Sequence, residues 1–153
     1  MPSRTLTVGI PQRLLLACEA FGPRLQGAAV ADAIARGVQD GGMPEPDVCL
    51  LAPEAEAAVD VRQLLDDLGF DARMRSARAV VIAAARLHEQ TLAGSVTFEI
   101  ATRARQGGVP AYAIAAASTL GAFDARILDL QLILEAHSRQ KLLAAGRELA
   151  QLA

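Results

Sequence analysis

The sequence has 153 residues, with 15 Lys+Arg against 17 Asp+Glu and a formal net charge of −2. This length suits one domain of ordinary size, and 52% hydrophobic against 21% charged residues excludes a globally disordered chain. The small negative charge excludes a general binder of nucleic acid or anionic membranes. Lys141 is the only lysine, so any chemistry that needs a lysine depends on that residue.

The sequence carries no signal for secretion or membrane insertion. Residues 1–12 lack the apolar core of a signal peptide, and the longest nearly apolar run, 109–117, is far shorter than the ~20 residues of a membrane span. Cys18 and Cys49 form no CxxC pair and are expected to be buried thiols rather than a disulfide. We therefore expect a cytoplasmic protein with no membrane or nucleic-acid partner.

The first half of the chain alternates apolar runs with amphipathic segments. Residues 13–17 and 47–51 are continuous apolar runs typical of buried strands. Residues 27–40 carry apolar side chains at helical spacing and end in Gly41-Gly42, which predicts a helix. A second helix is predicted over 54–68, since its acidic start suits the helix dipole.

The second half continues the alternation. Residues 71–78 are basic and lack a helical period, so their three arginines are interpreted as a solvated loop, and the scarcity of aromatic residues disfavours nucleic-acid binding there. Asp129 is a plausible N-cap for a long terminal helix. The remaining predicted elements are strands at 79–83, 109–115 and 125–128 and helices at 91–106 and 129–152.

This pattern predicts an α/β fold. Apolar strands alternating with helices indicate a mainly parallel sheet of four to six strands covered on both faces, a three-layer αβα, Rossmann-like single domain over residues 13–153. Residues 1–12 form an N-terminal extension that could add an edge strand. Ligands of such sheets bind outside the carboxyl ends of the strands. The segments expected there are 17–24, 52–56, 83–95 and 116–121.

Three segments match one known pattern. Residues 16–38 (LACEAFGPRLQGAAVADAIARGV) are similar to I-A-P-D-S-F-K-G-S-L-S-A-x-x-A-A-E-A-I-A-x-G, residues 86–94 (RLHEQTLAG) to R-L-D-x-Q-T-x-x-G, and residues 108–115 (GVPAYAIA) to G-V-P-V-x-A-I-A. Together they resemble the glycerate kinase family, the bacterial type with two α/β domains. The resemblance implies a Rossmann-like fold and, in intact relatives, phosphorylation of glycerate.

The departures from the family pattern fall on the chemistry. The family's Asp-Ser-Phe-Lys becomes residues 19–22 (EAFG), its Gly-Glu-Gly becomes residues 83–85 (AAA), and its Gly-rich run becomes residues 53–57 (PEAEA). No GxxxxGK or GxGxxG motif replaces them, fewer than twenty-five residues stand where the family has a second domain, and no lysine lies near a predicted strand end. Because phosphoryl transfer depends on positioned cations, we expect a truncated, degenerate and non-catalytic relative.

The polar residues that remain define a candidate ligand site. Thr91 lies at a predicted helix start, where backbone amides favour anions; alternatively it caps the helix, and Arg86 makes a surface ion pair. Glu19 and Arg24 could form a charged pair in the same crevice or belong to a solvated loop. His88 and Glu89 are too few for a metal site, which needs three or four ligands. The candidate ligand-binding residues are Glu19, Arg24, Arg86, His88, Gln90 and Thr91.

Three functional hypotheses follow. The first is a non-catalytic glycerate-kinase-like protein, without metal or cofactor, that binds a small carboxylate, a phosphate-bearing ligand or a protein partner. The second is a small kinase or transferase acting on glycerate or a related hydroxy acid. The third is a dimeric structural module without a ligand. A homodimer is expected because the terminal helix carries more than one apolar face.

Overall fold

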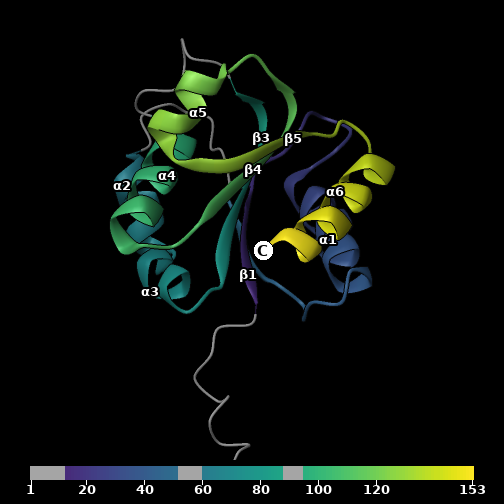
Figure 1. Cartoon of the computed structure of the whole chain (residues 1–153), viewed down its shortest axis with the longest axis horizontal. Coiled ribbons are helices and arrows are strands. Elements are labelled where there is room, and N and C mark those ends of the chain that lie inside the picture. The colour runs from purple at the N-terminus through teal and green to yellow at the C-terminus, as the bar shows by residue number, and fades with distance from the viewer. Residues whose placement is uncertain (1–12, 52–59, 88–94) are drawn as a thin grey trace, which may run out of the picture.

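The computed structural model describes residues 13–51, 60–87 and 95–153, and within them five strands form one all-parallel sheet (Figure 1). The strands are β1 Leu14–Cys18, β2 Asp47–Leu50, β3 Ala79–Leu87, β4 Ala111–Ser118 and β5 Leu130–Glu135. Their order in the sheet is β2-β1-β3-β4-β5. The predicted single-domain α/β fold with a parallel sheet is confirmed. The proposed extension at residues 1–12 lies outside the described residues.

Helices cover both faces of this sheet, as Figure 1 shows. One layer contains α1 (Gly27–Asp40) and α6 (Arg139–Leu152). The opposite layer contains α2 (Val61–Asp67), α3 (Phe70–Arg75), α4 (Val96–Gly107) and α5 (Ala122–Leu128). The inner strand β1 is fully buried, with Leu14 and Leu16 packed toward α1 and α6 and Leu15 packed toward the opposite layer. The apolar run that predicted a buried strand is explained by this cover on both sides.

The C-terminal third differs most from the sequence prediction. Residues 122–128 form a helix rather than a strand, and β5 occupies the start of the predicted helix 129–152. Asp129 is the C-cap of α5, with φ 59°, rather than an N-cap. Aspartate tolerates this left-handed conformation better than most residues. The helix α6 begins only after Ser138, whose hydroxyl accepts from the Lys141 amide at 3.2 Å.

Two further boundaries differ between the sequence prediction and the structure. The predicted helix 54–68 is described only from Asp60 onward, as α2, and Gly69 at φ 64° separates α2 from α3. The basic stretch predicted to be a loop therefore begins inside helix α3. Its Arg73 donates to both carboxylate oxygens of Asp47, at 2.7 and 3.0 Å, and at 2.8 Å to the carbonyl of Val48. Arg73 is thus a structural ion-pair partner rather than a solvated side chain.

The layer of α1 and α6 is held by contact between helix backbones. A β-carbon at Gly37 of α1 would overlap the Leu143 carbonyl oxygen and lie 2.9 Å from the Arg147 amide nitrogen. A β-carbon at Gly146 of α6 would overlap the Ile34 carbonyl oxygen. Only glycine fits at either position. One small-residue face of the terminal helix is therefore used within the chain, against α1.

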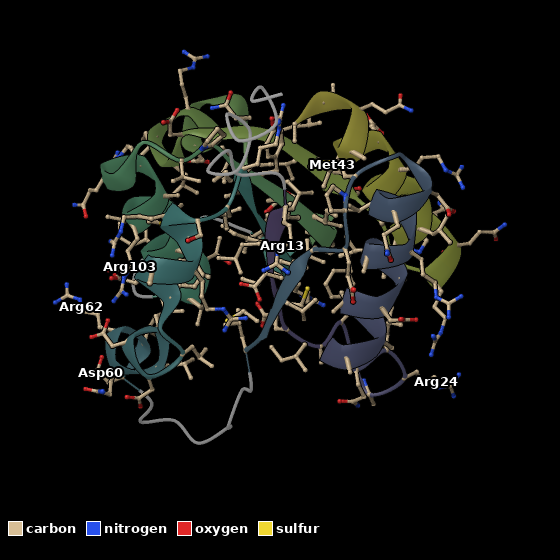
Figure 2. All side chains as sticks on the ribbon, turned by 90° about the horizontal axis from the view of Figure 1, so that it is seen from below. Arg13, Arg24, Met43, Asp60, Arg62 and Arg103 are labelled. Carbon is tan, nitrogen blue, oxygen red and sulfur yellow. The ribbon has the colours of Figure 1, made fainter. Side chains whose placement is uncertain are left out.

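The opposite layer is tied together by Arg103 of α4. Its guanidinium donates to Glu99 at 2.9 Å, to Asp66 of α2 at 3.0 Å and to Asp71 of α3 at 3.1 Å. Burial opposes the charge of Arg103, but these hydrogen bonds outweigh it and raise its pKa. Figure 2 shows Arg103 and Arg62 on the same side of the molecule. One side chain thus connects α2, α3 and α4.

Candidate ligand-binding site

The strand order of the sheet reverses between β1 and β3. The chain leaves β1 through α1 to reach β2 on one side, and it returns through α2 and α3 to β3 on the other side of β1. In open α/β sheets, ligands bind outside the carboxyl ends of the strands at such a reversal point. The carboxyl ends of β1 and β3 are therefore where a ligand site is expected.

Beyond the end of β1, the sheet continues as a two-stranded wall made of β3 and β4. Cys18, the last residue of β1, is paired with Ala83, but β3 continues to Leu87 and stays paired with β4. The Thr119 amide then donates to the Leu87 carbonyl at 2.8 Å. Residues 83–85, expected to lie in the crevice beyond the strand, are thus inside β3, and Ala83 and Ala84 are buried.

Glu19 follows the end of β1, at the base of this wall. Its amide donates to the Ala83 carbonyl at 3.0 Å, and its half-buried side chain has a raised pKa because of burial. The first residue of α1, Gly27, packs close to this strand end, since a β-carbon there would lie 3.6 Å from the Cys18 carbonyl oxygen and the Ala20 amide nitrogen. The strand end, Glu19 and the start of α1 are thus immediate neighbours.

Arg24 lies on the periphery of the molecule. Figure 2 shows its side chain pointing outward, and it is exposed. Glu19 and Arg24 are both described, and no ion pair within 4 Å joins them. Between them, Gly22 has φ +152° and lies in a tight turn in which the Phe21 amide donates to the Leu25 carbonyl at 2.8 Å. This turn is compatible with glycine and strained for other residues.

Arg86 lies near the free end of the wall. It is exposed and paired in register with Ala117 of β4. Glu19 comes directly after Cys18, which is paired with Ala83, and is therefore level with Ala84. Arg86 lies two residues further along β3, which is about 7 Å at roughly 3.3 Å per residue. His88, Gln90 and Thr91 lie outside the described residues. The helix that Thr91 was expected to begin starts at Val96, where the Ser95 hydroxyl accepts from the Phe98 amide at 3.1 Å.

Cys18 is a structural thiol. Burial, together with the nearby Cys49 and Glu19 charges, raises its pKa to about 12. The thiolate is the reactive form of cysteine, so Cys18 is unreactive near neutral pH. Both cysteines are free and buried, as predicted.

Two polar groups at the other strand ends were missed by the sequence analysis. Glu135, at the end of β5, accepts from the Ser118 amide at the end of β4, at 3.0 Å. Lys141 lies in the first turn of α6 beside Leu134 and Glu135. A lysine does therefore lie near a strand end, contrary to expectation. It is three strands from β1, about 14 Å across the sheet at the usual spacing.

Among residues 13–51, 60–87 and 95–153, no three His, Cys, Asp or Glu side chains are grouped so that they could hold a metal ion. In the same ranges, no helix has the length and apolar character needed to cross a membrane.

These features define an open α/β domain in which the described strands are parallel and the strand order reverses between β1 and β3. The family model of the glycerate kinase family matches residues 41–149. The chain therefore belongs to the glycerate kinase family, which confirms the resemblance. The match contains the second and third segments on which the resemblance rested and begins just after the first, at 16–38. No curated protein matches the chain.

Proposed function

We propose that this member of the glycerate kinase family does not transfer phosphate and instead binds a small hydroxy acid, or a similar carboxylate, at the carboxyl ends of β1 and β3. The observation that carries the proposal is the position of Glu19, half-buried at the end of β1 beside the wall that bears Arg86. An arginine guanidinium matches a carboxylate in shape and charge. Glu19 accepts a hydrogen bond from a ligand hydroxyl.

The backbone supports the absence of phosphoryl transfer. The family's lysine aligns with Gly22, and the φ of +152° there is unfavourable for a lysine. The family's Gly-Glu-Gly aligns with residues 83–85, which are alanines within β3. The single lysine, Lys141, lies in α6 near the edge strand β5, three strands away from β1. Stabilisation of a transferring phosphate needs positioned cations, and these positions do not supply them.

Thermal unfolding with and without ligand tests the proposal. Glycerate, 2-phosphoglycerate and Mg·ATP are each added at millimolar concentration. A ligand at 100 times its Kd adds about 2.7 kcal/mol to the free energy of unfolding, which raises Tm by roughly 5–10 °C for a domain of this size. We expect this rise with glycerate or 2-phosphoglycerate, and its loss in Arg86→Ala. The control Arg75→Ala, an exposed arginine of α3, keeps it. No rise with any of these compounds contradicts the ligand site and favours a protein partner.

A kinase assay tests the catalytic alternative separately. We expect no consumption of ATP in the presence of glycerate. Consumption that is abolished by Arg86→Ala but retained by Arg75→Ala would establish the enzyme and overturn the non-catalytic proposal.

The proposal also includes a homodimer in the cytoplasm. The two buried free thiols are consistent with a reducing compartment. The dimer is supported by the face of α6 that does not contact α1, where Lys141, Ala144 and Glu148 are exposed. Light scattering at high micromolar concentration tests the dimer: a monomer there contradicts it.

A further inference from the structure

The face of α6 turned toward β5 has charged residues and a hollow. The hollow has a volume of about 180 Å³ and is lined by Leu134 and Glu135 of β5 and by Lys141, Ala144, Ala145 and Glu148 of α6. Lys141, Ala144 and Glu148 are exposed. This face differs from the side of α6 that is packed against α1 through Gly146.

The charges of Lys141 and Glu148 are unpaired within the described chain, whereas Glu135, which lines the same hollow, accepts from the Ser118 amide. Lys141 and Glu148 are seven residues apart, about 10 Å along the helix, and neither has an opposite charge three or four residues away. No ion pair within 4 Å joins either one to another described residue. The neighbouring Arg147, by contrast, pairs with Asp40 of α1 at 3.7 Å. Opposite charges at the two ends of a face with a small residue between them are the pattern of a surface that complements itself.

We propose that a second copy of this chain docks on this face, with the two α6 helices antiparallel about a two-fold axis near Ala144. Residues 141 and 148 are equally distant from the point between residues 144 and 145. The two-fold axis therefore places Lys141 opposite Glu148 of the partner subunit, and Glu148 opposite Lys141 of the partner subunit. The small Ala144 side chain allows the helices to approach closely.

The same alignment brings apolar surface to the hollow. Leu152 is 53% exposed and one turn beyond Glu148 on the same helix. In the antiparallel pair, Leu152 of each chain is directed toward the start of the other α6, where Leu134 lines the hollow. In an isologous interface, both partners of each contact lie on the same surface of one subunit. This face of α6 and β5 carries both partners of each proposed contact. The inference rests on the proposed homodimer and is independent of the ligand site.

Charge reversal tests the surface in the full chain. Lys141→Glu and Glu148→Lys each create two like-charge contacts per dimer, so we expect each to raise the dimer dissociation constant at least about tenfold by sedimentation equilibrium. The double variant Lys141→Glu/Glu148→Lys restores both pairs, and its dissociation constant returns to within about threefold of the original. Arg75→Glu and Glu45→Lys, exposed residues elsewhere with the same charge changes, leave it unchanged.

The outcomes separate the surface from the dimer and from the ligand. A wild-type monomer at high micromolar concentration overturns both the dimer and its surface. A dimer that survives both single reversals overturns the surface alone. Single variants that are weakened but not rescued by the double variant overturn the two-fold alignment. All variants are exposed changes that retain the Tm of the wild type, and the rise in Tm with ligand reports on the ligand site independently.

Discussion

The two helical layers are held to the same sheet by opposite means. In the layer of α1 and α6, Gly37 and Gly146 bring two backbones into direct contact, with no room for a β-carbon. In the layer of α2 to α5, the long side chain of Arg103 donates hydrogen bonds to acidic side chains on three helices. The first layer depends on the absence of side chains and the second on the presence of one.

This difference determines how each layer responds to change. A backbone contact has no flexible part that can move aside, so the smallest added group separates the helices. An ion-pair network is partly solvated, and its members can exchange partners or water. We therefore expect a steep loss of stability in the first layer and graded losses in the second.

The largest effect is expected for Gly146→Ala. Replacing glycine by alanine inside a helix is otherwise favourable by about 1 kcal/mol, but here the new β-carbon overlaps the Ile34 carbonyl oxygen. We expect the free energy of unfolding to fall by about 3 kcal/mol, which lowers Tm by roughly 6–12 °C. Thermal unfolding followed by circular dichroism measures this change.

The matched control is Gly27→Ala at the start of α1. A β-carbon there makes only ordinary contacts, at 3.6 Å, so Tm should change little. If Gly146→Ala is as stable as Gly27→Ala, the helix backbones are not in contact and the comparison of the two layers fails.

A smaller loss is expected for Arg103→Met. Methionine keeps most of the apolar stem but leaves Glu99, Asp66 and Asp71 without their shared counter-charge. The side chain of Arg103 is 12% exposed, so we expect a cost of about 2 kcal/mol, between that of surface and buried pairs. Urea unfolding measures it, and high salt should recover part of the loss.

Arg105→Met provides the control on the same helix. Arg105 is exposed and donates to the Ile127 carbonyl at 3.3 Å. We expect a loss of less than about 1 kcal/mol, as for an ordinary exposed hydrogen bond. Equal losses for Arg103→Met and Arg105→Met would show that the network adds nothing to the stability of the second layer.

The smallest effect depends on pH. The hydrogen bond from Arg73 lowers the pKa of Asp47, so the folded state favours the charged carboxylate. This stabilisation is fully present above the unfolded pKa, near 4, and is lost as the pH falls through the lower folded pKa. Asp47→Asn should therefore cost about 1 kcal/mol at pH 7 and flatten the decline of stability in acid. Asp32→Asn, which breaks an exposed pair with Arg36, should do neither.

Much of the fold was predictable because local signals agreed with the tertiary structure. The helix over 27–40 has the predicted bounds, because the helical spacing of its apolar residues and the glycines that follow it both indicate a helix that ends there. Residues 122–135 were predicted incorrectly because propensity and pairing compete there. The run from Leu130 to Glu135 is compatible with a helix, and only the parallel partner β4 makes it a strand. Asp129 then ends a helix instead of beginning one.

The candidate site was predictable in place but not in detail. Parallel strand ends predicted the edge where Glu19 and Arg86 lie. β3 extends four residues beyond its pairing with β1. This extension was not predictable, because it depends on pairing with β4. Lys141 was assigned to the middle of a long helix for the same reason that β5 was missed. Sequence alone could not show that Arg73 reaches Asp47, since 26 residues separate them.

The bond from Arg73 to Val48 has a consequence for self-association into fibres. β2 is an edge strand of the sheet. The amide of Leu51, directly after β2, donates inward to the Cys18 carbonyl at 2.8 Å, and in a parallel pair alternate residues of the edge strand point toward its partner. Val48 faces the open side, where its carbonyl is occupied by a guanidinium at 2.8 Å. An incoming strand would have to displace this charge before it could pair, and edge strands protected by charge resist templated growth. We therefore expect this one arginine of a short helix to oppose strand addition at the β2 edge, where the side chains of Val48 and Leu50 are exposed.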